Sequence, residues 1–276
     1  MIGWLIYSAV DVEKNKYYIQ MYKDKFKEHF IEIKLVIVEE LENMEQYVKC
    51  NKVDFAINRS RNHIMGELLE QKGVRVFNSS SVTRIANNKG ITYEFLKDVV
   101  PFLAVKYGNE IIESKIENKG FEYPYVIKSC SGHGGSQVFL VNNSKEEEQA
   151  IKVMNGQEYV VQQCCSDLGR DVRVYIIGNK IIKAVLRTST ESFKSNYSLG
   201  GKVQEYTLNN EEKAMVERIV DKLPLDYAGI DFTFHNGKAV FNEIEDAVGA
   251  RMLYQVSDID IVEMYIKHIL EQLSKE

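Results

Sequence analysis

The chain has 276 residues, of which 45 % are apolar, and its formal net charge is −5 at pH 7. This length predicts one large domain or two to three small ones, and the acidic balance argues against non-specific binding to nucleic acid. No apolar run reaches the roughly 20 residues of a membrane span and no secretory leader pattern opens the chain, so we expect a cytoplasmic protein with no nucleic-acid or membrane partner. The composition leaves a homo-oligomer open.

The first 80 residues alternate short apolar runs with helical periodicity. Apolar side chains recur at helical spacing between Tyr18 and Phe30, and again over residues 64–69. Strands that alternate with helices predict a parallel α/β domain over about residues 1–80. The buried strands are expected at residues 2–6, 35–38, 53–57 and 74–77.

A central unit is expected over residues 81–158 and a C-terminal unit over residues 159–276. The central unit opens with one predicted helix at residues 81–99, which Pro101 ends. Both units contain short strands joined by turn residues, which predicts antiparallel sheets and makes the fold class α/β followed by α+β. The strands are expected at residues 102–105, 125–128, 138–141, 159–163, 171–177, 180–186, 231–235 and 239–244, with helices at 145–154 and near the C-terminus.

A lysine precedes a glycine-rich loop in the central unit. Residues 128–136 read Lys-Ser-Cys-Ser-Gly-His-Gly-Gly-Ser, so that Lys128 ends a predicted strand. Backbone N–H groups of such a loop can cover phosphates, but the order differs from a Walker A motif, in which the lysine follows the glycines and a helix comes next. A glycine-rich hairpin turn without a ligand explains the same residues equally well.

Acidic residues gather on a predicted hairpin near the C-terminus. Asp231 lies on one strand, and Glu243 and Glu245 lie on the next, after an Asn-Gly turn. Side chains alternate along a strand, so these three acids are expected on one face, where they would repel one another unless a cation lay between them. Carboxylates are the ligands that Mg²⁺ prefers, although a solvated outer face is the alternative. The four cysteines and five histidines lack the spacing of zinc ligands.

A polar stretch over residues 187–202 lies between these two features. It contains Arg187, Lys194 and Lys202 beside two glycines, and few of its side chains are apolar. A surface loop is one explanation. A clamp for phosphate and carboxylate groups is the other, because cations would then face the acidic hairpin.

These features, in this order, resemble the ATP-grasp superfamily, and in particular its RimK-type carboxylate–amine ligases, which are similar to ribosomal-protein glutamate ligases. The resemblance spans nearly the whole chain. Its more specific part is Asp-Val-Arg-Val-Tyr-Ile-Ile-Gly at residues 171–178, then Lys-Ser-Asn-Tyr-Ser-Leu-Gly-Gly at residues 194–201, then the strands of Asp231 and Glu243. It implies an N-terminal pre-ATP-grasp domain followed by two α+β lobes that clamp a nucleotide.

The resemblance implies ATP as a cofactor and assigns residues to it. Two lysines would reach the phosphates, an adenine site would lie near residues 162–164, and residues 194–196 would match a family segment that usually reads Arg-Ser-Asn. The full set expected to bind the nucleotide is Lys89, Lys128, Ser131, Gly132, Gly134, Gly135, Gln162, Gln163, Cys164, Asp171, Lys194, Ser195 and Asn196.

The metal pattern of the family is an aspartate on one strand and Glu-x-Asn on the next. Asp231 and Glu243 match it, whereas Glu245 replaces the asparagine and adds a negative charge. We expect one or two Mg²⁺ ions here, with Mn²⁺ as a substitute, and leave open that Asn242 or Asp246 is the ligand in place of Glu245. Because this asparagine is replaced, the sequence supports nucleotide binding more strongly than catalytic turnover.

The activity implied is formation of an amide or peptide bond from an amino acid or peptide through an acylphosphate, with release of ADP and phosphate. Arg173, Arg187 and Lys194 are expected to act on the reacting groups. Arg59 and Arg251 are expected to face the substrate. A surface ion pair is an equally good explanation for Arg173, Arg187 or Arg251. The alternatives are an ATP-binding regulatory or scaffold module without turnover, and a small-molecule kinase.

Overall fold

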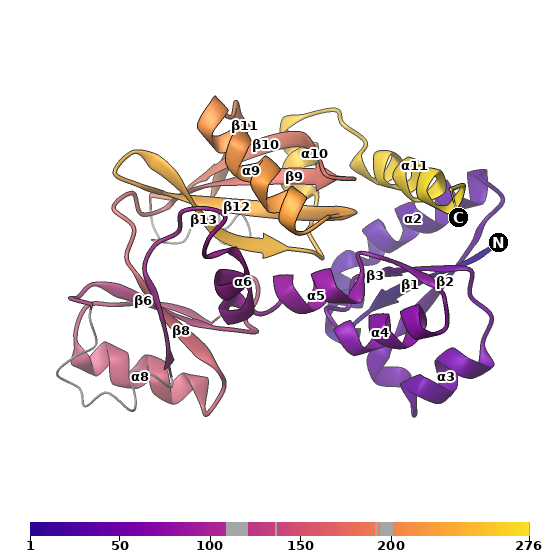
Figure 1. Ribbon diagram of the computed structural model, residues 1–276, viewed down its shortest axis with the longest axis horizontal. Coiled ribbons are helices and arrows are strands. Elements are labelled where there is room, and N and C mark those ends of the chain that lie inside the picture. Colours follow the sequence, from indigo (N-terminus) through magenta and orange to yellow (C-terminus); the bar gives the residue numbers. More distant parts are fainter. Residues whose placement is uncertain (109–120, 136, 191–192, 194–200, 276) are drawn as a thin grey trace.

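Three β-sheets organise the computed structural model of the chain (Figure 1). The structure describes residues 1–108, 121–135, 137–190, 193 and 201–275. The N-terminal sheet and the central sheet lie at opposite ends of the molecule, and the C-terminal sheet lies between and above them in this view. The combination of one parallel sheet with two antiparallel sheets confirms the expected α/β and α+β class.

The N-terminal sheet is parallel, with the order β2-β1-β3-β4. One of its two inner strands is β1, in which Trp4, Leu5 and Ile6 are completely buried because helices cover both faces of the sheet. The strands are β1 (Ile2–Tyr7), β2 (Glu32–Ile37), β3 (Phe55–Asn58) and β4 (Arg75–Phe77). The helical segments are α1 (Ala9–Val12), η1 (Glu13–Asn15), α2 (Lys16–Glu28), η2 (Val38–Glu40), α3 (Met44–Cys50) and α4 (His63–Gln71).

The central sheet is antiparallel, with the order β5-β8-β6-β7, and the helix over residues 144–154 packs on it. Its elements are β5 (Val105–Tyr107), β6 (Tyr125–Ser129), β7 (Val138–Val141), α8 (Ser144–Met154) and β8 (Tyr159–Gln163). Strand β8 pairs with β5 and β6, so this sheet runs past residue 158, where the sequence suggested a boundary.

The C-terminal sheet is antiparallel, with the order β11-β10-β9-β12-β13. An Asn236-Gly237 turn joins the last two strands, and both turn residues have positive φ, at 52° and 73°, as the tight hairpin requires. The strands are β9 (Arg170–Ile177), β10 (Lys180–Thr188), β11 (Lys202–Tyr206), β12 (Tyr227–His235) and β13 (Lys238–Glu245). The helices after β11 are α9 (Asn210–Lys222), α10 (Arg251–Val256) and α11 (Ile261–Leu273).

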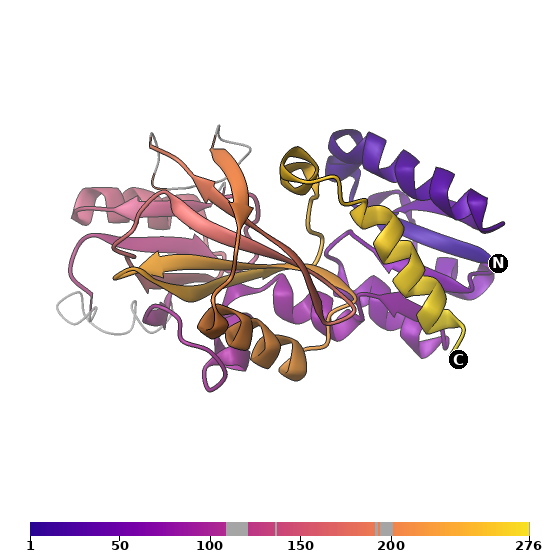
Figure 2. The same ribbon diagram turned by 90° about the horizontal axis from the view of Figure 1, so that it is seen from above.

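The two faces of the C-terminal sheet pack against helices from different parts of the chain. One face packs on α9 and on α5 (Ser80–Ala86) and α6 (Lys89–Leu96). The other face packs on α11, which lies beside α2 of the N-terminal domain (Figure 2). The helices that precede the central sheet in sequence therefore pack with the C-terminal sheet.

The segment expected as one helix over residues 81–99 is two helices. Asn88 interrupts it, because its side chain accepts a hydrogen bond from the backbone N–H of Ile91 and so starts α6 as an N-cap. Asn87 closes the preceding helix by donating to the backbone of Thr83. The break places Lys89 at the first position of α6.

Candidate active site

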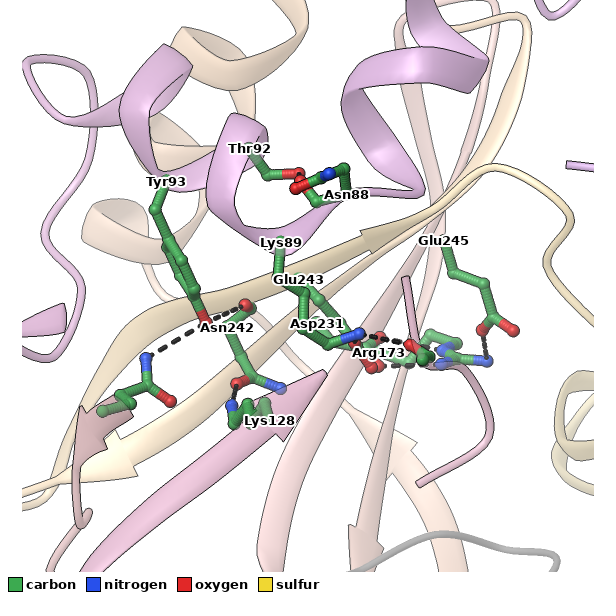
Figure 3. Close-up of polar contacts among 12 residues, drawn as sticks. Asn88, Lys89, Thr92, Tyr93, Lys128, Arg173, Asp231, Asn242, Glu243 and Glu245 are labelled. Atoms are coloured by element: carbon green, nitrogen blue, oxygen red, sulfur yellow. Dashed lines mark hydrogen bonds and ion pairs between the residues drawn. The ribbon is translucent and has the colours of Figure 1, made fainter. Parts of the chain in front are cut away.

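Two lysines meet where the central sheet approaches the C-terminal sheet. Lys128 is on β6 and is 8 % exposed, and its Nζ donates to Oδ1 of Asn242 on β13 over 2.8 Å (Figure 3). Lys89 begins α6, and its Nζ donates to the carbonyl of Gly132 over 2.6 Å and lies 3.4 Å from the carboxylate of Glu243. The two ammonium groups line one pocket, which we call the lysine pocket.

The electrostatics of the lysine pocket favour an anion. Burial lowers the pKa of Lys128 to about 8; the carboxylate of Glu243 opposes this shift and the positive charge of Lys89 adds to it. Both groups would be stabilised by a ligand that brings negative charge, because two close ammonium groups repel each other. The pocket therefore fits phosphate groups.

The glycine-rich segment after β6 forms part of the wall of the lysine pocket. Gly134 and Gly135 have φ values of 65° and 76°, which side chains rarely adopt, so glycine is needed at these positions. Both glycines, together with Glu243, also line a second pocket. The two pockets therefore meet at this segment.

Charged side chains form a ladder across the C-terminal sheet on the face that meets the N-terminal domain. Arg173 donates to both carboxylate oxygens of Asp231, over 2.8 and 2.7 Å, and Arg187 donates to one of them over 2.6 Å. At the two ends of the ladder, Arg187 pairs with Asp171 and Arg173 pairs with Glu245. The sequence produces this order because facing residues of neighbouring strands are cross-strand partners, as Arg187 is to Asp171 and Asp231 is to Arg173.

The ion pairs of the ladder occupy two of the three predicted metal ligands. Asp231 is completely buried, and although burial alone would raise its pKa, the guanidinium groups of Arg173 and Arg187 lower it to about 2. Among the residues that the structure describes, no three Asp, Glu, His or Cys side chains are close enough to share a metal ion. Asp231 and Glu245 are held by arginines, and Glu243 is the predicted ligand that lines the lysine pocket (Figure 3).

The second pocket lies between the N-terminal domain and the segment that follows β13. We call it the tyrosine pocket, because Tyr7, Tyr17, Tyr18 and Tyr254 contribute to its wall. Its charged lining includes Arg59 and Arg251, as the sequence suggested, and also Arg173, Arg187 and Glu245. Asp11 and Arg61, which form an ion pair at 2.5 Å, lie on the same wall.

Most residues expected to bind a nucleotide line the lysine pocket. They are Lys89, Lys128, Gly132, Gly134, Gly135, Gln162, Gln163 and Asp171. Cys165 is in the wall where Cys164 was expected, and Ser131 is not part of the wall. Lys194, Ser195 and Asn196 lie outside the described residues.

The structure adds residues and roles to the two pockets that the sequence did not predict. Asn242 is the partner of Lys128, His133 lines the lysine pocket, and the tyrosines of the second pocket come mainly from the first 18 residues. Asn242 was considered from the sequence only as a metal ligand, and its hydrogen bond to Lys128 was not predicted. The tyrosines carry no local pattern that distinguishes them from core residues.

Comparison with known proteins assigns the chain to a family. The RimK-like ATP-grasp domain matches residues 94–269. The chain belongs to the RimK-like ATP-grasp family. This match begins within α6 and runs into α11, so it includes Lys128, the ladder and Glu243.

Relatives of this ATP-grasp protein were found by sequence and by structure. Uncharacterized protein MG011 of Mycoplasma genitalium is 32 % identical over 96 % of this chain and 91 % of its own length. A probable alpha-L-glutamate ligase of Haemophilus ducreyi is 24 % identical over 72 % of this chain and 67 % of its own length. The D-alanine–D-alanine ligase of Bacillus anthracis complexed with ATP superposes with a TM-score of 0.78 at 16 % identity, covering 100 % of this chain and 98 % of that one, so the two share a fold.

Proposed function

We propose that this ATP-grasp protein is an ATP-dependent carboxylate–amine ligase that joins an amino acid or peptide to an amine. The observation that carries the proposal is the meeting of the two pockets at Gly134, Gly135 and Glu243. A phosphate chain in the lysine pocket would end beside a substrate in the tyrosine pocket. This adjacency is what transfer of a phosphoryl group to a carboxylate requires.

ATP is proposed to bind in the lysine pocket. Lys89 and Lys128 supply the positive charge, and the glycine-rich segment supplies backbone N–H groups. The base would lie at the other end, near Gln162, Gln163 and Cys165, where apolar side chains such as Leu103 and Val126 also line the wall. The name of the solved D-alanine–D-alanine ligase complex, which contains ATP, supports this choice of nucleotide.

A divalent cation is proposed to be held mainly by Glu243 and by the phosphates. Glu243 is in the wall shared by both pockets, and a carboxylate oxygen is a preferred ligand of Mg²⁺. Asp231 does not fit a metal in this arrangement, because both its oxygens are engaged by arginines. Such a cation would neutralise charge that develops on the phosphates.

The proposed chemistry has two steps. A carboxylate oxygen of the substrate attacks the γ-phosphorus, and the bond to ADP breaks to give an acylphosphate. The amine nitrogen then attacks the acyl carbon, phosphate leaves, and the nitrogen loses a proton. Negative charge builds up in both steps, and the cations of the two pockets are placed to stabilise it.

The test is product analysis with ATP, Mg²⁺ and pools of amino acids and short peptides. A ligase of this type releases ADP and phosphate together with a new amide that mass spectrometry detects. AMP as the product would rule out the acylphosphate route. A phosphorylated small molecule without an amide would identify a kinase, and tight ATP binding without product would identify a regulatory module.

A further inference from the structure

The floor of the tyrosine pocket contains a buried guanidinium that lacks a carboxylate partner. Arg59 is 4 % exposed, its Nε donates to the hydroxyl oxygen of Tyr7 over 2.9 Å, and its Nη2 donates to the carbonyl of Val248 over 2.7 Å. A guanidinium carries five N–H donors. The described part of the chain therefore leaves three of them without an acceptor.

Three other arginines of the tyrosine pocket are paired with acids, and Arg251 is exposed. Arg61 pairs with Asp11, Arg173 pairs with Asp231 and Glu245, and Arg187 pairs with Asp171 and Asp231. Arg59 instead lies among aromatic rings, with its guanidinium carbon 5.0 Å from the ring centre of Tyr18 and 5.8 Å from that of Tyr227. Rings attract a cation through their faces but give no acceptor for in-plane N–H groups. A buried charge without a counter-charge is costly, so the site favours an anionic ligand.

The hydroxyl of Tyr7 is a second donor at the same place. Its oxygen accepts from Arg59, and its own hydrogen has no acceptor among the described residues. Burial raises the pKa of Tyr7, so the hydroxyl keeps its proton at neutral pH. Arg59 and Tyr7 together present a charged and a neutral donor to one ligand group, which suits a carboxylate.

We propose that Arg59 and Tyr7 hold the carboxylate of a free amino acid with a large apolar side chain, and that the amine of this amino acid attacks the acylphosphate. This inference rests on the proposed ligase function. Arg59 and Tyr7 line only the tyrosine pocket, whereas Gly134, Gly135 and Glu243 line both pockets. A carboxylate held at the floor is therefore away from the phosphates, and the amine can point toward them.

The remaining wall of the tyrosine pocket determines the kind of side chain. Tyr17 is 79 % exposed and Tyr254 is 37 % exposed, and both present aromatic surface to the pocket, with Met21 and Met252 beside them. Covering such surface is favourable for an apolar ligand. Of the acids of this wall, Asp11 and Glu245 pair with arginines and Glu243 is assigned to the proposed divalent cation, so none is left for a basic side chain. The other two cations of the wall, Lys14 and Arg251, are exposed.

The reaction of this acceptor leaves its carboxylate unchanged. The amine nitrogen donates its electron pair to the acyl carbon, the bond from that carbon to the phosphate oxygen breaks, and the nitrogen loses a proton to solvent. Phosphate takes the electron pair of the broken bond. The product is an amide whose new terminal residue still has a free carboxylate.

Binding measurements test the carboxylate site without turnover. L-phenylalanine, L-phenylalaninamide and L-glutamate are titrated calorimetrically into the full chain with a non-hydrolysable ATP analogue and Mg²⁺. We expect L-phenylalanine to bind at least about tenfold more tightly than its amide, because hydrogen bonds to a charged group are lost in the amide. Tighter binding of L-glutamate, equal binding of the amide, or no binding of L-phenylalanine would overturn the inference.

Two hydroxyl deletions sharpen this test. Tyr7→Phe keeps the buried ring and should lower the affinity for L-phenylalanine about tenfold while leaving the affinity for the amide unchanged. Tyr123→Phe removes a hydroxyl from an exposed tyrosine that lines neither pocket and should leave the preference for the carboxylate intact. An unchanged preference in Tyr7→Phe would contradict the role of Tyr7.

Turnover separates this inference from the ligase proposal. If L-phenylalanine binds as expected but no ADP forms with any carboxylate donor, the carboxylate site stands and the ligase function falls. If ADP and amide form equally well with L-phenylalaninamide as acceptor, the ligase stands and the carboxylate site is refuted.

Discussion

Asp231 and Arg173 form a two-pronged ion pair, over 2.8 and 2.7 Å, at a position where the aspartate has no exposed surface. Replacing Asp231 with asparagine would leave Arg173 and Arg187 short of negative charge in a buried place. Breaking a buried pair in this way costs about 3–5 kcal/mol of unfolding free energy. The midpoint of urea unfolding should fall accordingly, with the slope unchanged.

A matched control for this change lies on the edge of the same sheet. Glu205 pairs with Lys183, but its side chain is 56 % exposed, so Glu205→Gln should cost less than about 1 kcal/mol. Equal effects of the two substitutions would show that burial of the Asp231 ladder contributes nothing special to stability.

Glu243 is expected to matter for turnover more than for folding. Its side chain is 35 % exposed, and its ion pair with Lys89 is long, at 3.4 Å. Glu243→Gln should therefore leave the unfolding midpoint nearly unchanged, while ADP release falls by about 100-fold or more because the pocket loses its accessible carboxylate. Coupled assays of ADP release measure this. Glu94→Gln, which alters an exposed pair with Lys97 on α6, is the control, and full activity of Glu243→Gln would remove Glu243 from the proposed site.

The lowered pKa of Lys128 predicts that ATP binding depends on pH. At pH values below about 8 the ammonium is charged and attracts phosphate, and as the pH rises through 8 the free protein loses this charge. ATP affinity should therefore weaken from neutral pH to about pH 9.5, and binding in that range should take up a proton. Calorimetry in buffers of different ionisation enthalpy measures the uptake.

The variant Lys128→Arg separates this effect from other titrations. A guanidinium stays protonated throughout the range, so proton uptake on ATP binding should disappear. Proton uptake that persists undiminished in Lys128→Arg would assign the titration to another group.

The parts of the site that the sequence predicted are those carried by local patterns. Lys128 precedes its glycines directly, and the Asn236-Gly237 turn fixes Asp231 opposite Glu243 as cross-strand partners. The ion pair between Asp231 and Arg173 was not predictable in this way, because it depends on the pairing of β9 with β12, which are far apart in sequence. The β-propensity of a segment indicates that it forms a strand, but not which other strand pairs with it.

The same limit explains the differences in the fold. The run at residues 159–163 was recognisable as a strand, whereas its pairing with β6 places it in the central sheet. The helix break was recoverable, since Asn88 is a good N-cap residue. The pocket of Tyr7 and Arg59 combines β1, the first residue of the segment that follows β3, and the segment near Val248, and only the folded chain brings these together.

Asn78 joins the N-terminal domain to the C-terminal sheet, and its loss should affect the two substrates differently. The side chain is 2 % exposed, accepts from the backbone N–H groups of Asp226 and Tyr227 over 2.7 and 3.0 Å, and donates to the carbonyl of Tyr227 over 2.7 Å. Asn78→Ala would leave these backbone groups buried without partners, which should lower the free energy of unfolding by about 1–3 kcal/mol for each group. As a control, Asn43→Ala, which removes the exposed N-cap of α3, should lower the free energy of unfolding by only about 1 kcal/mol.

Because the tyrosine pocket spans the junction that Asn78 holds, Asn78→Ala should raise the KM of the amino-acid substrate while the Kd of ATP in the lysine pocket stays nearly constant. Equal weakening of both would indicate general loss of the fold, and no change in either would show that the junction is held without this side chain.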